Sequence, residues 1–179
     1  MTEDKITLVV AEPGDLPAFK RALQEAFAVA VVEAFGPLPE PIPSDDDLDA
    51  TLAEPAAVAL RILLDGRDVG GAVVSIDETT RCNSLDLFFI AVGAQGRGLG
   101  RRAWFAIEKA FPETRVWRTH TPYFEKRNIH FYVNTCGFRI VEFFNARHPD
   151  PHRPPGDGGI TGSGEFPGGE EAFLFEKTM

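Results

Sequence analysis

The sequence is short of three features that mark particular classes of protein. Its two cysteines, Cys82 and Cys136, lack the spacing of a metal or redox motif, so we expect two reduced thiols in apolar packing. Its longest apolar runs fall far short of the roughly 20 residues that a membrane-spanning helix needs. Cations are also scarce. The net charge of −9 argues against nucleic acid and anionic membranes as partners.

The remaining composition is ordinary for a globular protein. The chain has 179 residues, of which 44% are hydrophobic and 25% charged, and we expect a single domain over residues 1–179. Residues 149–170 hold five Pro and seven Gly and predict a flexible loop. The acidic start, Met1–Lys5, has no signal-peptide pattern, so we expect a cytoplasmic protein.

Apolar periodicity predicts an α/β fold with a mixed, mostly antiparallel sheet flanked by helices. The predicted strands are 6–11, 58–64, 68–76, 87–92, 115–121, 138–144 and 172–176. The predicted helices are 16–34 with Asp15 as its cap, a short one to Leu52 capped by Ser44, 99–110, and one that starts at 122–123 and contains Tyr132. The Pro-rich stretch 37–43 cannot be regular structure.

The most informative stretch runs from the unbroken apolar run 87–92, read as a strand buried on both faces, into the helix at 99–110. Between them lie Gly93, Gly96 and Gly98, and Gly100 follows. A glycine-rich turn at a helix N-terminus aims free N–H groups and a partial positive charge at one point, which suits a phosphate. Such a turn also occurs as a plain connection between a strand and a helix, without a ligand.

The details of this loop separate it from two common phosphate loops. A Walker loop needs Lys and then Ser or Thr after its second glycine, whereas Arg101 and Arg102 follow Gly100. The dinucleotide fingerprint, aligned on Gly96 and Gly98, also meets Arg101 where it needs Gly. Gln95-x-x-Gly98-x-Gly100 does resemble the Q/R-x-x-G-x-G/A signature that binds the pyrophosphate of acyl-coenzyme A in the GNAT superfamily of N-acetyltransferases.

The resemblance to the GNAT superfamily spans about residues 6–145. The segment Asn128-Ile-His-Phe-Tyr132-Val-Asn-Thr-Cys-Gly137-Phe138 resembles its second signature, the start 6–16 its first strand and helix cap, and Val69-Gly70-Gly71 its third strand. In one departure, Tyr132 and Gly137 are five positions apart instead of four. This spacing predicts a bulge or a wider turn at the end of the Tyr132 helix.

The resemblance implies a single GNAT-like domain that moves an acetyl group from acetyl-CoA to an amine by direct attack. Tyr132 would protonate the departing thiolate and Asp86 would be the base, with Glu78, His120 and Glu125 as rivals. Asn128 would bind the cofactor arm. The loop residues Gln95, Gly96, Arg97, Gly98, Leu99, Gly100 and Arg101 would hold the pyrophosphate, and the strand residues Ile90, Ala91 and Val92 the pantetheine arm.

For several of these residues a purely structural role is an open alternative. Tyr132 would otherwise be a packed core residue, Asp86 a solvated strand residue, and Asn128, Arg97 and Arg101 solvated helix residues. A non-catalytic acyl-CoA-binding sensor or interaction module, or a domain that binds another nucleotide, would also use such a loop. We expect no metal, since His148 and His152 in a Pro-rich turn make a poor ligand set.

The acceptor is the least determined part of this interpretation. No Lys or Arg lies between Arg21 and Arg61, whereas that interval holds eight acids: Glu25, Glu33, Glu40, Asp45, Asp46, Asp47, Asp49 and Glu54. In GNAT relatives the turn between the first two helices borders the acceptor pocket, so this acidic segment predicts a small cationic amine. The alternative is an acidic face that serves solubility. A homodimer is also compatible with the sequence.

Overall fold

The computed structural model of the protein describes residues 4–152 and 171–179. Within them, seven strands form one sheet in the order β1-β2-β3-β4-β5-β7-β6, and only β4 and β5 run parallel. The strands are β1 Ile6–Val10, β2 Ala57–Leu64, β3 Arg67–Ser75, β4 Cys82–Ile90, β5 Val116–Pro122, β6 Arg139–Phe144 and β7 Ala172–Thr178. The predicted α/β class with a mostly antiparallel sheet is confirmed. The predicted loop falls mainly on residues 153–170, outside the described residues.

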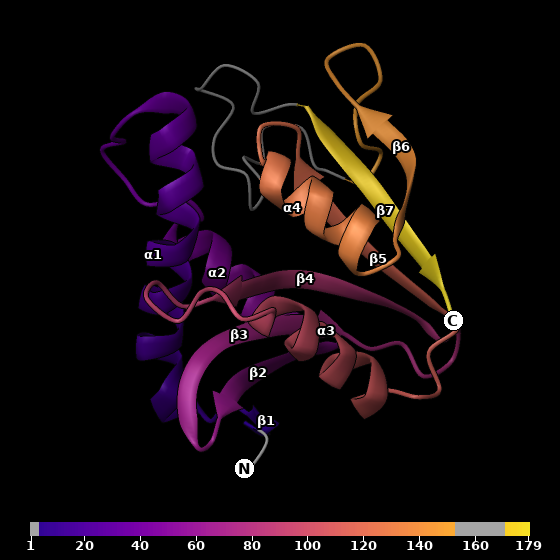
Figure 1. Ribbon diagram of the computed structural model, residues 1–179. Coiled ribbons are helices and arrows are strands. Elements are labelled where there is room, and N and C mark those ends of the chain that lie inside the picture. Colours follow the sequence, from indigo (N-terminus) through magenta and orange to yellow (C-terminus); the bar gives the residue numbers. More distant parts are fainter. Residues whose placement is uncertain (1–3, 153–170) are drawn as a thin grey trace.

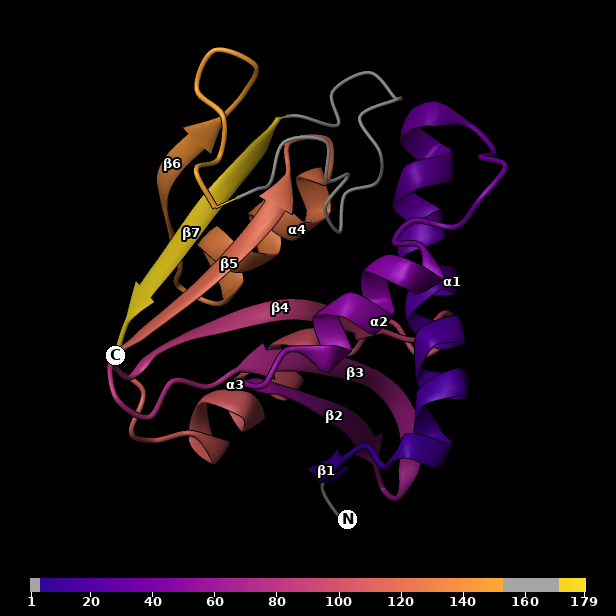
Figure 2. The same ribbon diagram turned by 180° about the vertical axis from the view of Figure 1, so that it is seen from behind.

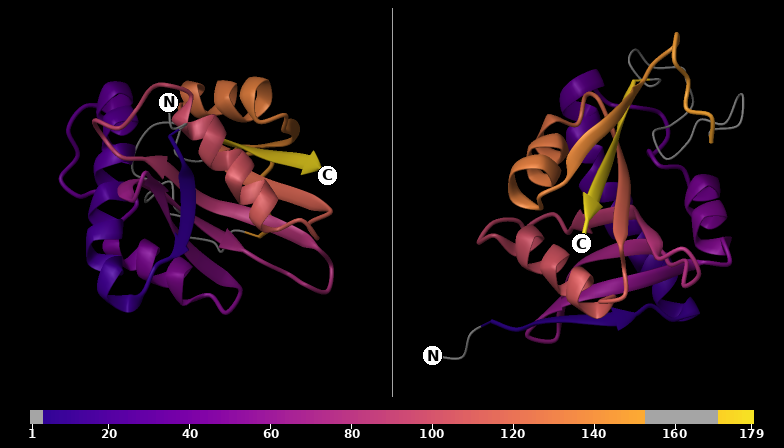
Figure 3. Two further views of the ribbon diagram at one scale, coloured as in Figure 1. Left: turned by 60° about the horizontal axis from the view of Figure 1, so that its bottom comes forward. Right: turned by 90° about the vertical axis from the view of Figure 1, so that its right-hand side faces the viewer.

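Helices cover both faces of the sheet. Helices α1 Leu16–Phe35 and α2 Asp45–Ala53 lie on one face, and α3 Leu99–Ala110 and α4 Lys126–His130 lie on the other (Figures 1 and 2). The side view in Figure 3 (right) shows these two layers of helices with the sheet between them. On the α3 and α4 face the core is built around the fully buried rings of Trp104, Trp117, Phe138 and Phe175.

The two N-terminal helices start differently. Asp15 occupies the N-cap position of α1 as predicted, but its side chain makes no hydrogen bond to the helix. Its carboxylate instead accepts from the Glu12 N–H at 2.9 Å and closes a short 3-10 turn, Pro13–Asp15, that leads into the helix. The Ser44 cap of α2 is confirmed, because its hydroxyl oxygen accepts from the Asp47 N–H at 3.2 Å. The Asp47 carboxylate accepts from Ser44 in return, which completes a capping box.

Removing this cap gives a first testable prediction. Ser44→Ala leaves the Asp47 N–H without its side-chain acceptor, so the free energy of unfolding falls by about 1 kcal/mol. Urea denaturation followed by circular dichroism measures the change. An unchanged urea midpoint would show that the capping box does not stabilise α2.

The parallel strands β4 and β5 are paired over only part of their length. Their register runs from Cys82 opposite Val116 to Leu85 opposite Thr119 and then stops, although β4 continues to Ile90. In Figures 1 and 2 the two strands meet near the C-terminus and diverge toward α1. The N–H and C=O groups on this edge of β4 beyond Leu85 are therefore left open to a ligand.

Strand β4 corrects two sequence predictions. It begins at Cys82 and ends at Ile90, before Val92, and its residues alternate between buried and half-buried instead of being buried on both faces. A bulge explains the side-chain directions: Leu85 pairs with Val74 and Leu87 with Val73, so Asp86 is the extra residue. Leu85 packs in the core under α3, whereas Leu87 packs under α1.

The segment with Tyr132 differs from prediction at its start and agrees at its end. The helix begins at Lys126 instead of 122–123, because β5 continues to Pro122, opposite Ala172, and the Tyr123 N–H donates to the Glu171 carbonyl at 2.9 Å. At its end, Phe131–Thr135 forms a π-helical turn. The Cys136 N–H reaches back five residues to the Phe131 carbonyl at 2.9 Å. The predicted wider turn is confirmed, and it absorbs the extra residue before Gly137.

Candidate active site

The glycine-rich loop forms a tight turn before α3. Gly96, Arg97 and Gly98 have φ of 108°, 54° and 63°, three left-handed residues in a row. The Leu99 N–H donates to the Gly96 carbonyl at 3.1 Å, and the first α-helical bond runs from the Arg102 N–H to the Gly98 carbonyl at 3.1 Å. The N–H groups of Gly100 and Arg101 therefore have no acceptor within the helix and can donate to an anion.

The end of β4 presents its main chain to the opening between the strands. The Ala91 N–H points the other way, since it donates to the Val69 carbonyl on β3 at 2.8 Å. Because main-chain groups alternate along a strand, those of Ile90 face the open edge. Val92 follows β4 in a turn that the Ala94 N–H closes on the Ala91 carbonyl at 3.0 Å. Val92 is 56% exposed, so nothing of the core covers this position.

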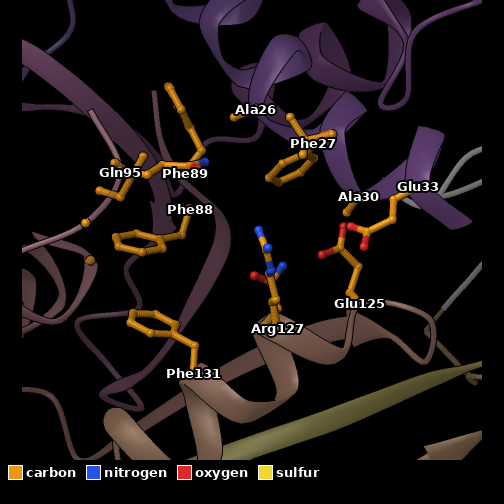
Figure 4. Close-up of a pocket in the computed structure, with 15 residues that line it drawn as sticks. Ala26, Phe27, Ala30, Glu33, Phe88, Phe89, Gln95, Glu125, Arg127 and Phe131 are labelled. Carbon is orange, nitrogen blue, oxygen red and sulfur yellow. The ribbon is translucent and has the colours of Figure 1, made fainter. Parts of the chain in front are cut away.

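A cavity of about 270 Å³ lies beside this loop (Figure 4). We call it the loop-side cavity. Its lining comes from α1, the end of β4, the loop and the start of α4: Ala26, Phe27, Val29, Ala30, Glu33, Phe88, Phe89, Ile90, Gln95, Gly96, Gly100, Glu125, Arg127, Asn128 and Phe131.

One wall of the loop-side cavity explains why position 100 is glycine. The rings of Phe88 and Phe131 stack at 5.7 Å, and this pair joins β4 to α4. A Cβ on Gly100 would lie 3.3 Å from the Phe131 ring and 3.9 Å from Ile90. Any side chain there would crowd the passage between the free N–H groups and the strand edge. The residues present thus leave room for a slender chain with an anionic end.

A second cavity, of about 220 Å³, lies where β4 and β5 part. We call it the carboxylate cavity, because Asp86 and Glu125 line it. Its other lining residues are Phe27, Val31, Ile42, Ser84, Leu85, Leu87, Phe88, Thr119, His120, Thr121, Pro122, Phe124, Asn128, Tyr132 and Ala172. Phe27, Phe88, Glu125 and Asn128 line both cavities, so the two adjoin.

Asp86 is held by two serines in the carboxylate cavity. Its Oδ2 accepts from the Ser75 hydroxyl at 2.5 Å and its Oδ1 from the Ser84 hydroxyl at 2.6 Å. Burial raises the pKa of Asp86 above its ordinary value, and the two hydrogen bonds oppose this shift. Ser84 could have been found from the sequence, because a residue two positions before Asp86 on a strand shares its face.

Two of the three predicted rivals of Asp86 share its cavity. Burial raises the pKa of Glu125 to about 7, and its carboxyl accepts no hydrogen bond from the described part of the chain. Burial lowers the pKa of His120, whose Nε2 lies 3.5 Å from Asp150. Glu78 lies exposed in the turn between β3 and β4 and lines neither cavity.

Tyr132 is 5% exposed and lines the carboxylate cavity. Burial raises the pKa of its hydroxyl well above the ordinary value, although a hydrogen bond with Thr119 opposes the shift. The Thr119 hydroxyl itself donates to the Leu85 carbonyl at 2.8 Å, at the last paired position of β4 and β5. Tyr132 is therefore a protonated donor at neutral pH, placed where the strands part.

The profile of the acetyltransferase (GNAT) family matches residues 20–138. The chain belongs to the GNAT acetyltransferase family. It is 54% identical over 151 residues to the uncharacterized protein YrkN of Bacillus subtilis (strain 168), a match that covers 84% of this chain and 82% of YrkN.

Solved GNAT structures share the fold at low identity. A Bacillus subtilis acetyltransferase in complex with CoA has a TM-score of 0.65 at 17% identity, covering 98% of this chain and 99% of its own. A GNAT family acetyltransferase from Elizabethkingia anophelis with acetyl-CoA bound has a TM-score of 0.66 at 16% identity, covering 99% of this chain and all of its own.

The structure brings some of the GNAT residues predicted for the cofactor together and separates others. Ile90, Gln95, Gly96, Gly100 and Asn128 line the loop-side cavity. The remaining predicted residues lie outside its lining: Ala91, Val92, Arg97, Gly98, Leu99 and Arg101.

The two predicted arginines differ from a third one that sequence reasoning missed. The Arg101 guanidinium lies 5.5 Å from the Phe105 ring on the outer side of α3, and Arg97 is exposed on the loop. Arg127 instead points into the middle of the loop-side cavity, facing Glu33 and Glu125 (Figure 4). It follows directly on the short turn after β5, and no motif in the sequence marks it.

Three of the eight acids in the acidic segment have partners within α2 or between α1 and α2. Asp49 pairs with Lys20 at 2.7 Å, Asp45 accepts from Gln24 at 2.9 Å, and Asp47 belongs to the capping box. Of the eight acids, Glu33 alone lines either of the two cavities. The acidic side chains that line the cavity where β4 and β5 part are instead Asp86 and Glu125.

A nucleophilic cysteine, a metal site and a membrane span were also considered from the sequence. Cys136 is buried, and burial raises the pKa of its thiol to about 12, which disfavours a thiolate nucleophile. His148 lies 2.7 Å from Glu142, and residues 4–152 and 171–179 contain no group of three His, Cys, Asp or Glu side chains placed to hold a metal ion. In the same residues, no helix has both the length and the apolar character needed to cross a membrane.

Proposed function

We propose that this protein is an N-acetyltransferase that moves the acetyl group of acetyl-CoA to the amine of a small acceptor. One observation carries the proposal. The loop-side cavity, with its phosphate-binding turn, adjoins the carboxylate cavity, with its proton donor and acceptors, where β4 and β5 part. The family and the CoA-bound structural relatives support the choice of carrier.

The loop-side cavity and the main chain beside it offer groups that suit each part of the cofactor. The free N–H groups of Gly100 and Arg101 would hold the pyrophosphate at the start of α3. The open main-chain groups of Ile90 and Val92 would hydrogen-bond the pantetheine arm, and the Val92 N–H would polarise the thioester carbonyl. Asn128, which lines both cavities, would hydrogen-bond the arm near its reactive end.

The proton steps use groups of the carboxylate cavity. An acceptor amine with a pKa of about 10 arrives as an ammonium, and it must lose one proton before it attacks and a second on the way to the amide. We assign the first proton to a carboxylate. Tyr132 donates its proton to the departing thiolate and takes up the second proton of the amine, so the products are the amide, the free thiol of CoA and one proton on the carboxylate. The sequence interpretation gave the base role to Asp86. Glu125 is the stronger alternative, because its pKa of about 7 matches the task and it lies where the two cavities adjoin.

The pH dependence of the rate separates the two carboxylates. With Glu125 as base, kcat/KM falls as pH drops through about 7, because protonated Glu125 cannot accept a proton. Glu125→Gln then removes this fall on the acidic side of the pH–rate profile and lowers kcat by about 10²–10⁴-fold. Asp86→Asn keeps the fall near pH 7. The measurement is free-thiol release over roughly pH 5.5 to 9, a range that spans the titration of such a group. A fall near pH 7 that survives in Glu125→Gln and disappears in Asp86→Asn would return the base role to Asp86.

Thiol release also tests the proposed function against the acyl-CoA sensor considered from the sequence. A sensor would bind the carrier and would release no thiol with any amine. If calorimetry shows that acetyl-CoA binds and no amine of a broad panel is turned over, the protein is a binding module and not an enzyme.

A further inference from the structure

We infer that the acceptor is a primary monoamine with an apolar body, an arylalkyl or short alkyl amine, and that it lacks a carboxylate and a second cationic centre. This inference rests on the proposed function and narrows it to a substrate class. It follows from the lining of the carboxylate cavity and is independent of the acidic segment between α1 and α2.

The charged groups of the cavity favour a single cation. Its two carboxyl groups are Asp86 and Glu125, and none of its lining residues in the described part of the chain is Lys or Arg. Both oxygens of Asp86 already accept serine hydroxyls, which keeps the carboxylate in place with lone pairs to spare for an ammonium. An acceptor with its own carboxylate would bring another acid to this pair, with no Lys or Arg among the lining residues to offset its charge.

The rest of the wall is apolar and comes from three separate segments. Phe27 and Val31 project from α1, Ile42 from the stretch before α2, and Phe124 from the turn after β5. Val31, Ile42 and Phe124 line this cavity alone, whereas Phe27 also lines the loop-side cavity. An aryl or alkyl group placed against them leaves water without losing hydrogen bonds.

The same wall disfavours a polyamine. A second ammonium along the acceptor chain would lie against Phe27, Val31 or Phe124. The side chains of these three residues carry no oxygen that could replace the water molecules hydrating the ammonium. The volume of about 220 Å³ is below the usual range of sites for drug-sized ligands, so the body is limited to about one ring or a short chain.

Two matched pairs of acceptors test the inference by free-thiol release from acetyl-CoA. The pair 2-phenylethylamine and phenylalanine differs by a carboxylate, and the pair butylamine and putrescine differs by a second ammonium. We expect kcat/KM to be at least about 100-fold higher for 2-phenylethylamine than for phenylalanine, and about tenfold or more higher for butylamine than for putrescine, as unpaired buried charges are rejected strongly.

The outcomes separate this inference from the proposed function. A higher kcat/KM for phenylalanine or putrescine than for its partner would overturn the substrate class and leave the acetyltransferase intact. No thiol release with any amine would overturn the proposed function, and the substrate class with it.

Neighbouring valines of α1 give a matched pair of variants. Val31 is 4% exposed and lines the cavity, whereas Val32 is 45% exposed and lines neither cavity. Val31→Ala should lower kcat/KM for 2-phenylethylamine about tenfold, with the KM for acetyl-CoA unchanged, since the apolar body loses a contact. Val32→Ala should leave both constants as they are. Equal constants in the two variants, with a folded Val31→Ala protein by circular dichroism, would contradict the placement of the acceptor body.

Discussion

Replacing Tyr132 by Phe lowers kcat by about 10²–10⁴-fold and leaves the KM for acetyl-CoA nearly unchanged. The reason is that the change deletes only a hydroxyl, which we propose as the proton donor to the thiolate. The ring stays packed against Phe138 and Phe175, at centroid distances of 5.5 and 5.7 Å, and the Thr119 hydroxyl keeps its bond to Leu85. The measurement is steady-state thiol release with the acceptor saturating.

The second tyrosine of the chain supplies the control. Tyr123 is 43% exposed, packs on Phe143 and Phe173, and lines neither cavity. Tyr123→Phe should keep full activity. A Tyr132→Phe enzyme with wild-type kcat would show that this residue only packs in the core, the alternative considered from the sequence.

Replacing Gly98 by Val weakens CoA binding by about tenfold or more, because it strains the turn that aims the N–H groups. A β-branched residue at φ of +63° costs about 1–2 kcal/mol, and relief of that strain moves the start of α3. A Cβ at this position would meet nothing within 4 Å, so the expected effect comes from the backbone and not from a clash. Calorimetry with CoA measures the loss.

A glycine in the β2–β3 hairpin is matched to Gly98 in conformation but not in place. Gly66 has φ of +81° and, like Gly98, open space around its missing side chain. Gly66→Val should reduce stability by a similar amount and leave the Kd for CoA unchanged. If both variants bind CoA as the wild type does, the turn does not hold the phosphates.

The features that the sequence predicted well are local ones. The turn from Gly93 to Gly100 could be predicted from residue order alone, because glycines before a helix permit the positive φ angles that a tight turn needs. The Ser44 cap of α2 and the wide turn that contains Tyr132 are local in the same sense. Each rests on a spacing of three to five residues that can be counted in the chain.

The features that the sequence could not predict depend on distant contacts. The start of α4 was misplaced because Pro122 lies opposite Ala172, fifty positions away, in strand pairing that no local pattern reveals. The direction of Asp86 depends on a bulge between β3 and β4. Glu125 could be told apart from the other rivals of Asp86 only in the folded chain, where it lines both cavities and burial raises its pKa to about 7.

The most direct test of the proposed acetyl transfer is to follow acetyl-CoA and 2-phenylethylamine together, measuring free thiol by absorbance and the amine by mass spectrometry. We predict that each thiol released is matched by one N-acetylated amine, and that Tyr132→Phe slows both signals equally. Binding of acetyl-CoA with neither thiol nor acetylated amine formed, over a panel that also includes diamines and amino acids, would contradict it.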